Sequence, residues 1–343
     1  MTESKKIKST VLVTGASGTV GREVIDQLVK LNKLYDVRVF DVKNAKSMRL
    51  FDRYRGKIKV YYGDITKPED LDEPTQNVEY VIHLAAIIPP LAYNKPELTT
   101  KVNVEGTKNL LEALETNSPK CFFALSSSVA VYGDRMSNPY IRVTDKIQPS
   151  YGDNYGETKV QMENLVQQSK LDWTIFRLSA IMGADNHKIT PLMFYMPLDT
   201  PVEITTPEDT ARAFVRACMH REELNKTVFN LGGGELCRTS YRRLLQRNFH
   251  IFGLGKLDFP LGAFAIRNYH CGYYADGDNL EDILHFRKDT LGDYYHKVEK
   301  NASWFKKLGA LTFSDLIKKV LLQKSEPYVA FKQGDAIKMK KFF

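Results

Sequence analysis

The feature that most constrains the fold is a glycine-rich turn that follows an apolar run near the N-terminus. The run Thr10-Val-Leu-Val-Thr14 is rich in β-branched residues and is typical of a strand. It leads into Gly15-Ala-Ser-Gly18-Thr-Val-Gly21 and then into a helical pattern with one apolar face. Gly15 would permit the tight turn, Gly18 a close approach to a pyrophosphate, and Gly21 close packing of helix on strand. This order predicts a dinucleotide-binding unit.

A second strand-like run ends in an acidic residue at a distance that suits a nucleotide. Val37-Arg-Val-Phe40 is followed by Asp41, 20 residues after Gly21. A carboxylate there can bind both hydroxyls of an adenosine ribose. It would also repel a 2′-phosphate, so Asp41 favours NAD over NADP, and the nearby Lys43 weakens that preference without removing it.

Strand-like runs recur along the chain with helical stretches between them. They cover residues 10–14, 37–41, 58–62, 80–84, 121–125, 173–178 and 227–231. The alternation predicts an α/β fold with a doubly wound parallel sheet, Rossmann-like, of about seven strands. Right-handed crossovers place ligands at the carboxyl ends of such strands. The notable residues that follow the first five runs are Gly15, Asp41, Asp64, Ala85, Ala86 and Ser126 to Ser128.

The pattern changes after about residue 183. Prolines at 191, 197, 201 and 207 exclude one long helix, and a helix is expected over Glu208 to His220. The remainder is rich in aromatic residues and mostly helical, and Thr312-Phe-Ser-Asp315 predicts a capped helix start. We therefore expect an NAD-binding domain over residues 1–182 and 203–231. A smaller, mostly helical substrate-binding region is expected over residues 183–202 and 232–343.

A second chemical signal is Tyr155-Gly-Glu-Thr-Lys159. A Tyr and a Lys four residues apart lie on one helical face. An ammonium group close to a phenol lowers its pKa from about 10, which a phenol needs for acid–base work near neutral pH. Such a pair alone is usually a surface accident, but the glycine turn makes a catalytic role the better hypothesis.

Composition and charge exclude several classes of protein. The 343 residues, 43% hydrophobic, suffice for a buried core, but no stretch is long and apolar enough to span a bilayer. The polar, basic N-terminus does not read as a secretion signal. Four cysteines without metal-ligand spacing predict reduced thiols, a cytoplasmic protein and no metal. The net charge of +8 gathers largely at the two ends without a nucleic-acid motif, so we expect neither nucleic acid nor a membrane as partner.

With these residues assembled, the chain resembles the extended short-chain dehydrogenase/reductase family, in its NAD-dependent epimerase/dehydratase branch. The resemblance covers about residues 10–235. It rests on motifs in the family's order, namely Thr14 to Gly21, Gly63-Asp64-Ile65, His83-Leu-Ala-Ala86, Asn103-Val-Glu-Gly-Thr107, Leu125 to Gly133, Tyr155 and Lys159. In this family Asn103 would open a helix, and the helices near Asn103 and Tyr155 often form a homodimer interface.

The resemblance implies a catalytic triad of Ser128, Tyr155 and Lys159. Tyr155 would move a proton on the substrate oxygen, Lys159 would lower its pKa and hold the nicotinamide ribose, and Ser128 would hydrogen-bond the same oxygen. NAD would carry the hydride. The residues implied to bind it are Gly15, Ser17, Gly18, Thr19, Val20, Asp41, Asp64, Ile65, Leu84, Ala85, Ala86, Asn103, Ser126, Ser127, Tyr155 and Lys159.

Three functions stay open at this point. The first is an epimerase or dehydratase acting on a small-molecule sugar substrate, nucleotide-linked, with NAD retained. The second is an alcohol dehydrogenase or ketone reductase, favoured by Ala180 where sugar-nucleotide enzymes commonly carry an asparagine and by a short segment from Gly183 to Glu208. The third is a non-catalytic NAD-sensing protein, which the presence of both Tyr155 and Lys159 disfavours.

Overall fold

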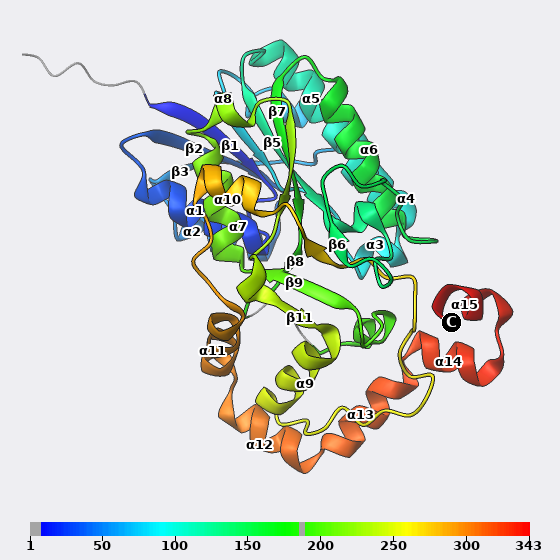
Figure 1. Ribbon diagram of the computed structural model, residues 1–343. Helices are drawn as coiled ribbons and strands as arrows, with labels where there is room; N and C mark the ends of the chain where they lie inside the picture. The colour runs from blue at the N-terminus through cyan, green and yellow to red at the C-terminus, as the bar shows by residue number, and fades with distance from the viewer. Residues whose placement is uncertain (1–7, 185–188) are drawn as a thin grey trace, which may run out of the picture.

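A seven-stranded parallel sheet forms the centre of the molecule (Figure 1). The computed structural model describes residues 8–184 and 189–343. The strand order is β10-β7-β5-β4-β1-β2-β3, with every neighbouring pair parallel. The strands are β1 (Ser9–Thr14), β2 (Tyr35–Asp41), β3 (Ile58–Tyr62), β4 (Tyr80–His83), β5 (Phe122–Ser128), β7 (Asp172–Leu178) and β10 (Thr227–Leu231). The predicted fold and its seven strands are confirmed.

The order of the strands reverses between β1 and β4. Strand β1 pairs with β2 on one side and with β4 on the other, and Thr14 lies opposite His83. The loops that begin at Gly15 and at Leu84 therefore leave the sheet side by side. A crevice at such a switch point is where open α/β sheets bind ligands.

Helices cover both faces of the sheet and bury two apolar cores. One core packs α1 (Thr19–Lys30), α2 (Ala45–Asp52), α7 (Pro207–Ala217) and α10 (Asp278–Leu284) on the sheet. The other packs α5 (Gly106–Asn117) and α6 (Asn154–Gln168) on the opposite face. Short helices α3 (Leu91–Asn94), α4 (Pro96–Thr100) and α8 (Arg221–Leu224), the 3₁₀ turns η1 (Pro68–Leu71) and η3 (Val129–Tyr132) and the π-helical turn η2 (Lys101–Glu105) complete this part.

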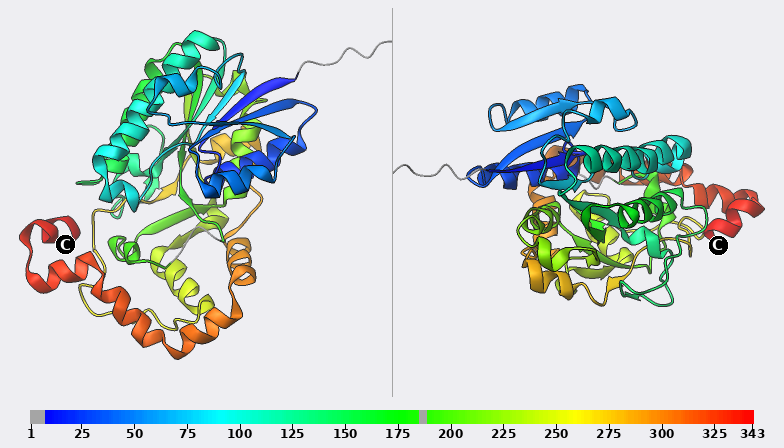
Figure 2. Two further views of the ribbon diagram at one scale, coloured as in Figure 1. Left: turned by 180° about the vertical axis from the view of Figure 1, so that it is seen from behind. Right: turned by 90° about the horizontal axis from the view of Figure 1, so that it is seen from above.

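A second, smaller lobe lies beyond the carboxyl edge of the sheet (Figures 1 and 2). It holds a three-stranded sheet of β8 (Ala180–Ile181), β9 (Pro201–Thr205) and β11 (Arg238–Ser240). Its other elements are η4 (Pro191–Tyr195), η5 (Glu235–Cys237), α9 (Tyr241–Ile251), α11 (Leu291–Asn301), α12 (Trp304–Thr312), α13 (Ser314–Gln323), α14 (Glu326–Gln333) and α15 (Ala336–Phe342). Strands β6 (Tyr140–Ile141) and β12 (Tyr273–Tyr274) pair with each other in a separate two-stranded sheet.

The exact division into domains stays a prediction. The expected boundary between residues 202 and 203 falls inside β9, which pairs in the small sheet. Conversely, α10 and Phe286 come from the expected substrate-binding region but pack into the core around α1 and α7.

Three local predictions are wrong. The serine run does not follow the fifth strand but ends it, because pairing with β7 continues from Ser126 to Ser128. Asn103 does not open a helix, since it lies in η2, midway along a helical segment that begins at Pro96. Thr312 caps no helix start: it is the last residue of α12, its hydroxyl bonds to Leu308 O at 3.1 Å, and α13 follows directly.

Candidate active site

The glycine turn after β1 is shaped for close approach of a ligand. Gly15 has φ +67°, and a Cβ there would lie 2.6 Å from the backbone nitrogen of Ala85. A Cβ on Gly21 would lie 2.6 Å from Gly15 O, so both positions require glycine. Gly18 is the N-cap of α1 and offers no side chain to cap the helix, and its first turn through Arg22 holds no acid. The backbone amides at the N-terminus of α1 fit a pyrophosphate.

Asp41 lies beside this turn, where the sequence predicts it. Its Oδ2 accepts the backbone N–H of Ser17 at 2.7 Å and its Oδ1 that of Val42 at 2.8 Å. The carboxylate is 7% exposed and is thereby held next to the residues that open α1, including Thr19 and Val20. Each oxygen keeps a second lone pair that can accept a hydroxyl. The geometry fits an adenosine ribose.

Asp64 and Ile65 extend the same edge of the sheet after β3. The Oδ1 of Asp64 accepts the N–H and hydroxyl of Thr66, and these bonds, the backbone one foremost, hold the pKa of Asp64 below its usual range. Ile65 is buried, and a Cβ on Gly106 would lie 2.6 Å from its Cγ2. The segment is thereby fixed against α5, and its contact with adenine stays a prediction.

The loop after β4 is tied to both the glycine turn and the helix of the triad. Leu84 N and Ala85 N donate to the carbonyl and hydroxyl of Thr14 at 3.2 and 3.3 Å. The buried Asn103 accepts Ile87 N at 2.7 Å and donates to Ile87 O and to Thr158 Oγ1, each at 3.1 Å. Because Thr158 precedes Lys159, Asn103 sets the distance between the loop, which includes Ala86, and α6.

Ser128, Tyr155 and Lys159 meet at the carboxyl edge of the sheet. The side chain of Ser128, the last residue of β5, hydrogen-bonds the Tyr155 phenol. The ammonium of Lys159, one helical turn along α6, lies 5.8 Å from the centre of the Tyr155 ring and donates to Ser126 O at 2.7 Å. All three side chains are at most 9% exposed. Asp153 caps α6 through Gly156 N and fixes the start of this helix.

The electrostatics of the pair differ from the sequence prediction. Burial raises the pKa of Tyr155 to about 12, although the bond from Ser128 lowers it, and Lys159 is not among the groups that shift it. Burial lowers the pKa of Lys159 to about 8, and the charge of Glu163 raises it. The expected lowering of the Tyr155 pKa by Lys159 is therefore wrong for this structure, because desolvation dominates.

A buried polar network lies next to the triad, and the sequence analysis did not predict it. Ser127 Oγ donates to Glu163 Oε1, and Arg177 Nη2 donates to Glu163 Oε2 at 2.8 Å. Arg177 Nη1 also donates to Tyr132 OH at 2.7 Å, and this hydroxyl donates to Asn230 Oδ1 at 2.8 Å. Glu163 follows Lys159 by four residues, a spacing that could have indicated a shared helix face.

An aromatic wall beside the triad is formed by Tyr93 on α3 together with Tyr195 and Tyr269. Tyr93 packs with Ala92, Ala130 and Tyr155, and its ring stacks on Tyr195 at 6.3 Å. Tyr269 stacks on His270, whose Nδ1 lies 2.9 Å from Asp153 Oδ2.

The last helix of the chain reaches this wall. The ammonium of Lys341 on α15 lies 6.0 Å from the ring centre of Tyr93 and 5.5 Å from that of Tyr195. Tyr195 OH donates to Glu326 on α14. Sequence analysis noted the aromatic richness of this region but had no signal that would place it at the triad.

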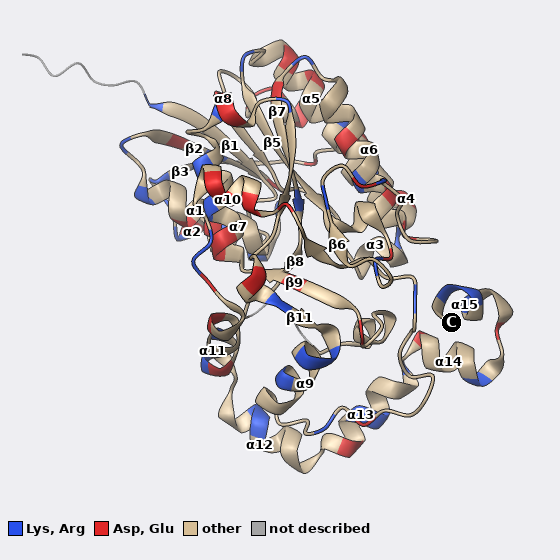
Figure 3. Cartoon of the chain, in the orientation of Figure 1, with Lys and Arg blue, Asp and Glu red and all other residues tan. Residues whose placement is uncertain are grey.

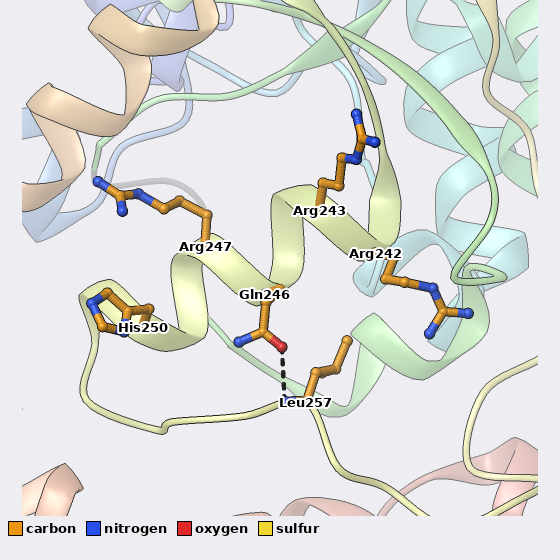
Figure 4. A pocket seen from close by; sticks show the side chains of 6 residues that line it. All are labelled: Arg242, Arg243, Gln246, Arg247, His250 and Leu257. Carbon is orange, nitrogen blue, oxygen red and sulfur yellow. Dashed lines mark hydrogen bonds between the residues drawn. The ribbon is translucent and has the colours of Figure 1, made fainter.

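Two surface hollows lie away from the triad. One, of about 610 Å³, lies over α9 and is lined by Arg242, Arg243, Gln246, Arg247, His250 and Leu257 (Figure 4). Arg242 and Arg247 pair with Asp199 and Glu299, and Gln246 accepts Leu257 N, so these side chains hold the lobe together. The other, of about 660 Å³, lies at the amino ends of the strands near Ser9, Tyr35 and Tyr80.

Known proteins match the part of the chain that carries these residues. The model of the 3-beta hydroxysteroid dehydrogenase/isomerase family matches residues 12–176. A D-erythronate dehydrogenase of Haemophilus influenzae is 26% identical over 175 residues, which cover 50% of this chain and 54% of that protein. A UDP-glucose 4-epimerase of Rickettsia rickettsii is 32% identical over 133 residues, 37% of this chain and 38% of that protein. The chain therefore matches only about a third to a half of the length of these relatives.

Solved structures match most of the chain. UDP-glucuronic acid 4-epimerase from Bacillus cereus, in complex with UDP-glucuronic acid and NAD, has a TM-score of 0.71 at 20% identity, over 85% of this chain and 98% of that chain. A dTDP-glucose 4,6-dehydratase from Streptomyces venezuelae with NAD bound has a TM-score of 0.70 at 20% identity, over 85% and 96%. The chain shares its fold with these structures, and the family match over residues 12–176 agrees with the resemblance to the extended short-chain dehydrogenase/reductase family. These matches support the epimerase/dehydratase branch that the sequence predicts.

The chain brings its predicted site residues to one edge of the sheet. The glycine turn, Asp41, the loop after β4 and the triad all lie at the carboxyl ends of β1, β2, β4 and β5. Their individual roles stay predictions. Within residues 8–184 and 189–343, no three His, Cys, Asp or Glu are placed to hold a metal, and no helix is long and apolar enough to cross a bilayer. The four cysteines are buried and free.

Proposed function

We propose that the chain is an NAD-dependent epimerase or dehydratase that acts on a nucleotide-linked sugar through transient hydride transfer. The observation that carries the proposal is the buried Ser128–Tyr155–Lys159 arrangement beside a glycine turn that fits a pyrophosphate. A relative named as a UDP-glucose 4-epimerase, and similar structures of a dehydratase and an epimerase solved with NAD bound, support the same reaction class. NAD, when bound, takes and returns the hydride.

The residues of the triad would handle the proton. The Tyr155 phenol is protonated at neutral pH, since burial raises its pKa to about 12, so it is set to donate to a carbonyl oxygen that is being reduced. In the oxidation direction Tyr155, as its phenolate, would take the hydroxyl proton, and Lys159 would hold the nicotinamide ribose, as the family resemblance implies. The Ser128 hydroxyl would hold the same substrate oxygen as its charge develops.

The cofactor would be held by backbone and by one acid. The amides that open α1 would bind the pyrophosphate, and Asp41 would accept the ribose hydroxyls, which favours NAD over NADP. We expect Asp64 and Ile65 to contact the adenine, and Leu84, Ala85 and Ala86 to line the nicotinamide half.

A second candidate is an NAD-dependent alcohol dehydrogenase or ketone reductase on a non-sugar substrate. It is supported by the D-erythronate dehydrogenase relative, whose match covers half of this chain, and by Ala180, which lies in β8 at about the position where sugar-nucleotide enzymes commonly carry an asparagine. The small side chain of Ala180 offers no hydrogen bond to a sugar hydroxyl.

The deciding experiment is to denature the purified protein and assay the supernatant for NAD and NADH. Stoichiometric cofactor would mean that it stays bound through a closed redox cycle, as epimerisation and dehydration require. An empty site that binds NAD reversibly, with steady NADH turnover on a ketone or aldehyde, would favour the dehydrogenase. Failure to bind NAD in either form would contradict both.

A further inference from the structure

The face of the second lobe that points away from the central sheet carries a cluster of exposed apolar side chains. Figure 1 shows α12 and α13 along this edge of the molecule. The exposed fractions run from 42% for Val320 to 68% for Phe305. We call the cluster the α12–α13 patch, and its members are Trp304, Phe305, Leu308, Leu311, Phe313, Leu316 and Val320. Contiguous exposed apolar surface of this kind marks an interaction site.

The spacing places the exposed apolar side chains of each helix on one stripe, and the two helices are separated only by Phe313. Trp304, Leu308 and Leu311 recur at i, i+4 and i+7 on α12, and Leu316 and Val320 at i and i+4 on α13. The rings of Trp304 and Phe305 stack with centres 3.5 Å apart. The inward faces of the same helices pack on the core of the lobe through Ala310, Ile317, Leu321 and Leu322. The two helices are thus held in place by one apolar face while a second apolar face points outward.

Lysines surround the patch. Residues 301–324 contain five lysines and one acid, Asp315. Lys318 pairs with Asp258 and lies on the inner side. The other four, Lys306, Lys307, Lys319 and Lys324, are exposed, and no ion pair joins them to an acid in the described ranges 8–184 and 189–343. Figure 3 shows basic residues on both α12 and α13. The patch therefore combines aromatic and aliphatic side chains with a positive rim.

We propose that the α12–α13 patch docks the protein on the surface of an anionic phospholipid membrane. Trp, Phe and Leu side chains would enter the boundary between headgroups and acyl chains, and the lysines would meet the lipid phosphates. A second copy of the chain is the poorer occupant, because symmetric contact would bring the two lysine rims together. Each helix is only 9 or 10 residues long, so the patch lies on a membrane and does not cross it.

This inference replaces the sequence-based expectation that no membrane is a partner. That expectation rested on the gathering of the net charge at the two ends of the chain, and it did not consider the lysines that lie among the aromatic side chains of residues 301–324. The membrane proposal is independent of the proposed catalytic function, because the patch shares no residue with the triad or with the residues expected to bind NAD.

The experiment uses the full chain with two kinds of vesicle, pure phosphatidylcholine and an equal mixture of phosphatidylcholine and phosphatidylglycerol. The chain has two tryptophans, and Trp173 is buried, so Trp173→Phe leaves Trp304 as the only tryptophan. We expect co-sedimentation and a blue shift of Trp304 fluorescence with the anionic vesicles at low salt. The partition should fall in high salt, where the lysine contribution is screened.

Two sets of variants test the residues. Phe305→Glu with Leu308→Glu should lower the vesicle partition by about tenfold or more, since charges replace the inserted groups. Lys306→Glu with Lys307→Glu should weaken binding to anionic vesicles. Leu261→Glu, at a position 85% exposed outside the patch, is the matched control and should bind like the parent chain.

Either of two results would overturn the proposal. One is the absence of binding to anionic vesicles at low salt by a chain that melts normally. The other is a change of oligomeric state on Phe305→Glu with Leu308→Glu, seen by light scattering without any vesicle binding by the parent, which would assign the patch to a second copy. Because the patch is exposed, the variants should melt within a few degrees of the parent, and this is checked first.

Discussion

The two walls of the crevice are built in different ways. The cofactor wall consists of backbone amides, glycines and short side chains at the ends of β1, β2, β3 and β4, and most of its contacts are backbone hydrogen bonds. The aromatic wall consists of large side chains, Tyr93, Tyr195 and Tyr269, from three segments far apart in sequence, with Lys341 from the last helix. Because a dinucleotide has one shape, the residues of the cofactor wall can be specified by short local motifs. A substrate wall is assembled by tertiary packing and can vary without disturbing the sheet.

The largest expected effect lies where the two walls meet. Tyr155→Phe should lower kcat about a thousandfold, because the proton carrier is lost, while the Kd for NAD stays unchanged. Isothermal titration and turnover assays measure the two quantities separately. Tyr151→Phe, at an exposed position close by, is the control. Loss of NAD binding in Tyr155→Phe would show a structural role instead.

The network beneath the triad should matter next. Glu163→Gln leaves the buried guanidinium of Arg177 without its carboxylate, and we expect the free energy of unfolding to fall by about 3–5 kcal/mol. The Lys159 pKa should fall further, since Glu163 raises it, so activity should be lost at a lower pH on the alkaline side. Chemical denaturation and a pH–rate profile measure these effects.

Two variants separate charge from structure in this network. Glu163→Met with Arg177→Met removes both charges and should be more stable than Glu163→Gln alone. Glu157→Gln, on the exposed side of the same helix, should change neither stability nor the pH profile. An unchanged alkaline limb in Glu163→Gln would show that Glu163 does not act on Lys159.

On the cofactor wall, Asp41→Ala should weaken NAD binding about tenfold to a hundredfold and shift preference toward NADP, because the acceptor of the ribose hydroxyls and the repulsion of a 2′-phosphate are lost together. Titration with both cofactors measures the ratio. Asp36→Ala, at an exposed position on the same strand, is the control. A constant NAD/NADP ratio would mean that Asp41 does not touch the ribose.

On the aromatic wall, Lys341→Met should raise the KM for an anionic, nucleotide-linked substrate about tenfold with kcat unchanged, because the ammonium lies beyond Tyr93 and not at the reacting atoms. Lys332→Met, exposed on α14, should leave KM unchanged. A fall in kcat without a rise in KM would show that Lys341, at the aromatic wall, does not bind the substrate.

Near neutral pH, the smallest expected effect is that of His83 on stability. His83 is buried between the hydroxyls of Thr14 and Thr107, and burial, with the charge of Lys159, lowers its pKa to about 3. The unfolded chain takes up this proton near pH 6.5 but the folded chain does not, so stability should fall as pH drops from about 6.5 toward 3, by up to about 1.4 kcal/mol per pH unit. His83→Gln should flatten this part of the stability–pH curve, measured by chemical denaturation. A slope unchanged in His83→Gln would assign the effect to other groups.

Local patterns were sufficient for the sheet and the cofactor wall. The glycine turn after Thr14, the acid after Phe40 and the run of strands are each defined by residues a few positions apart, and the structure has all seven strands. The predicted helix over Glu208 to His220 is present as α7, although it ends at Ala217. Where the predictions at Asn103 and Thr312 are wrong, a neighbouring helical turn continued through the expected boundary.

The sequence by itself determined the strands, their carboxyl-end motifs and the spacing of Tyr155 and Lys159, because these depend on periodicity and on fixed spacings within one turn or one loop. The role of Ser128 came from the family resemblance and stays a prediction. Only the tertiary structure decided that burial, not Lys159, sets the pKa of Tyr155, and that Glu163 and Arg177 pair beneath the triad. It also decided that the last helix reaches Tyr93 and that the α12–α13 patch faces outward. Desolvation and contacts between distant segments depend on which surfaces meet, and no local pattern records that.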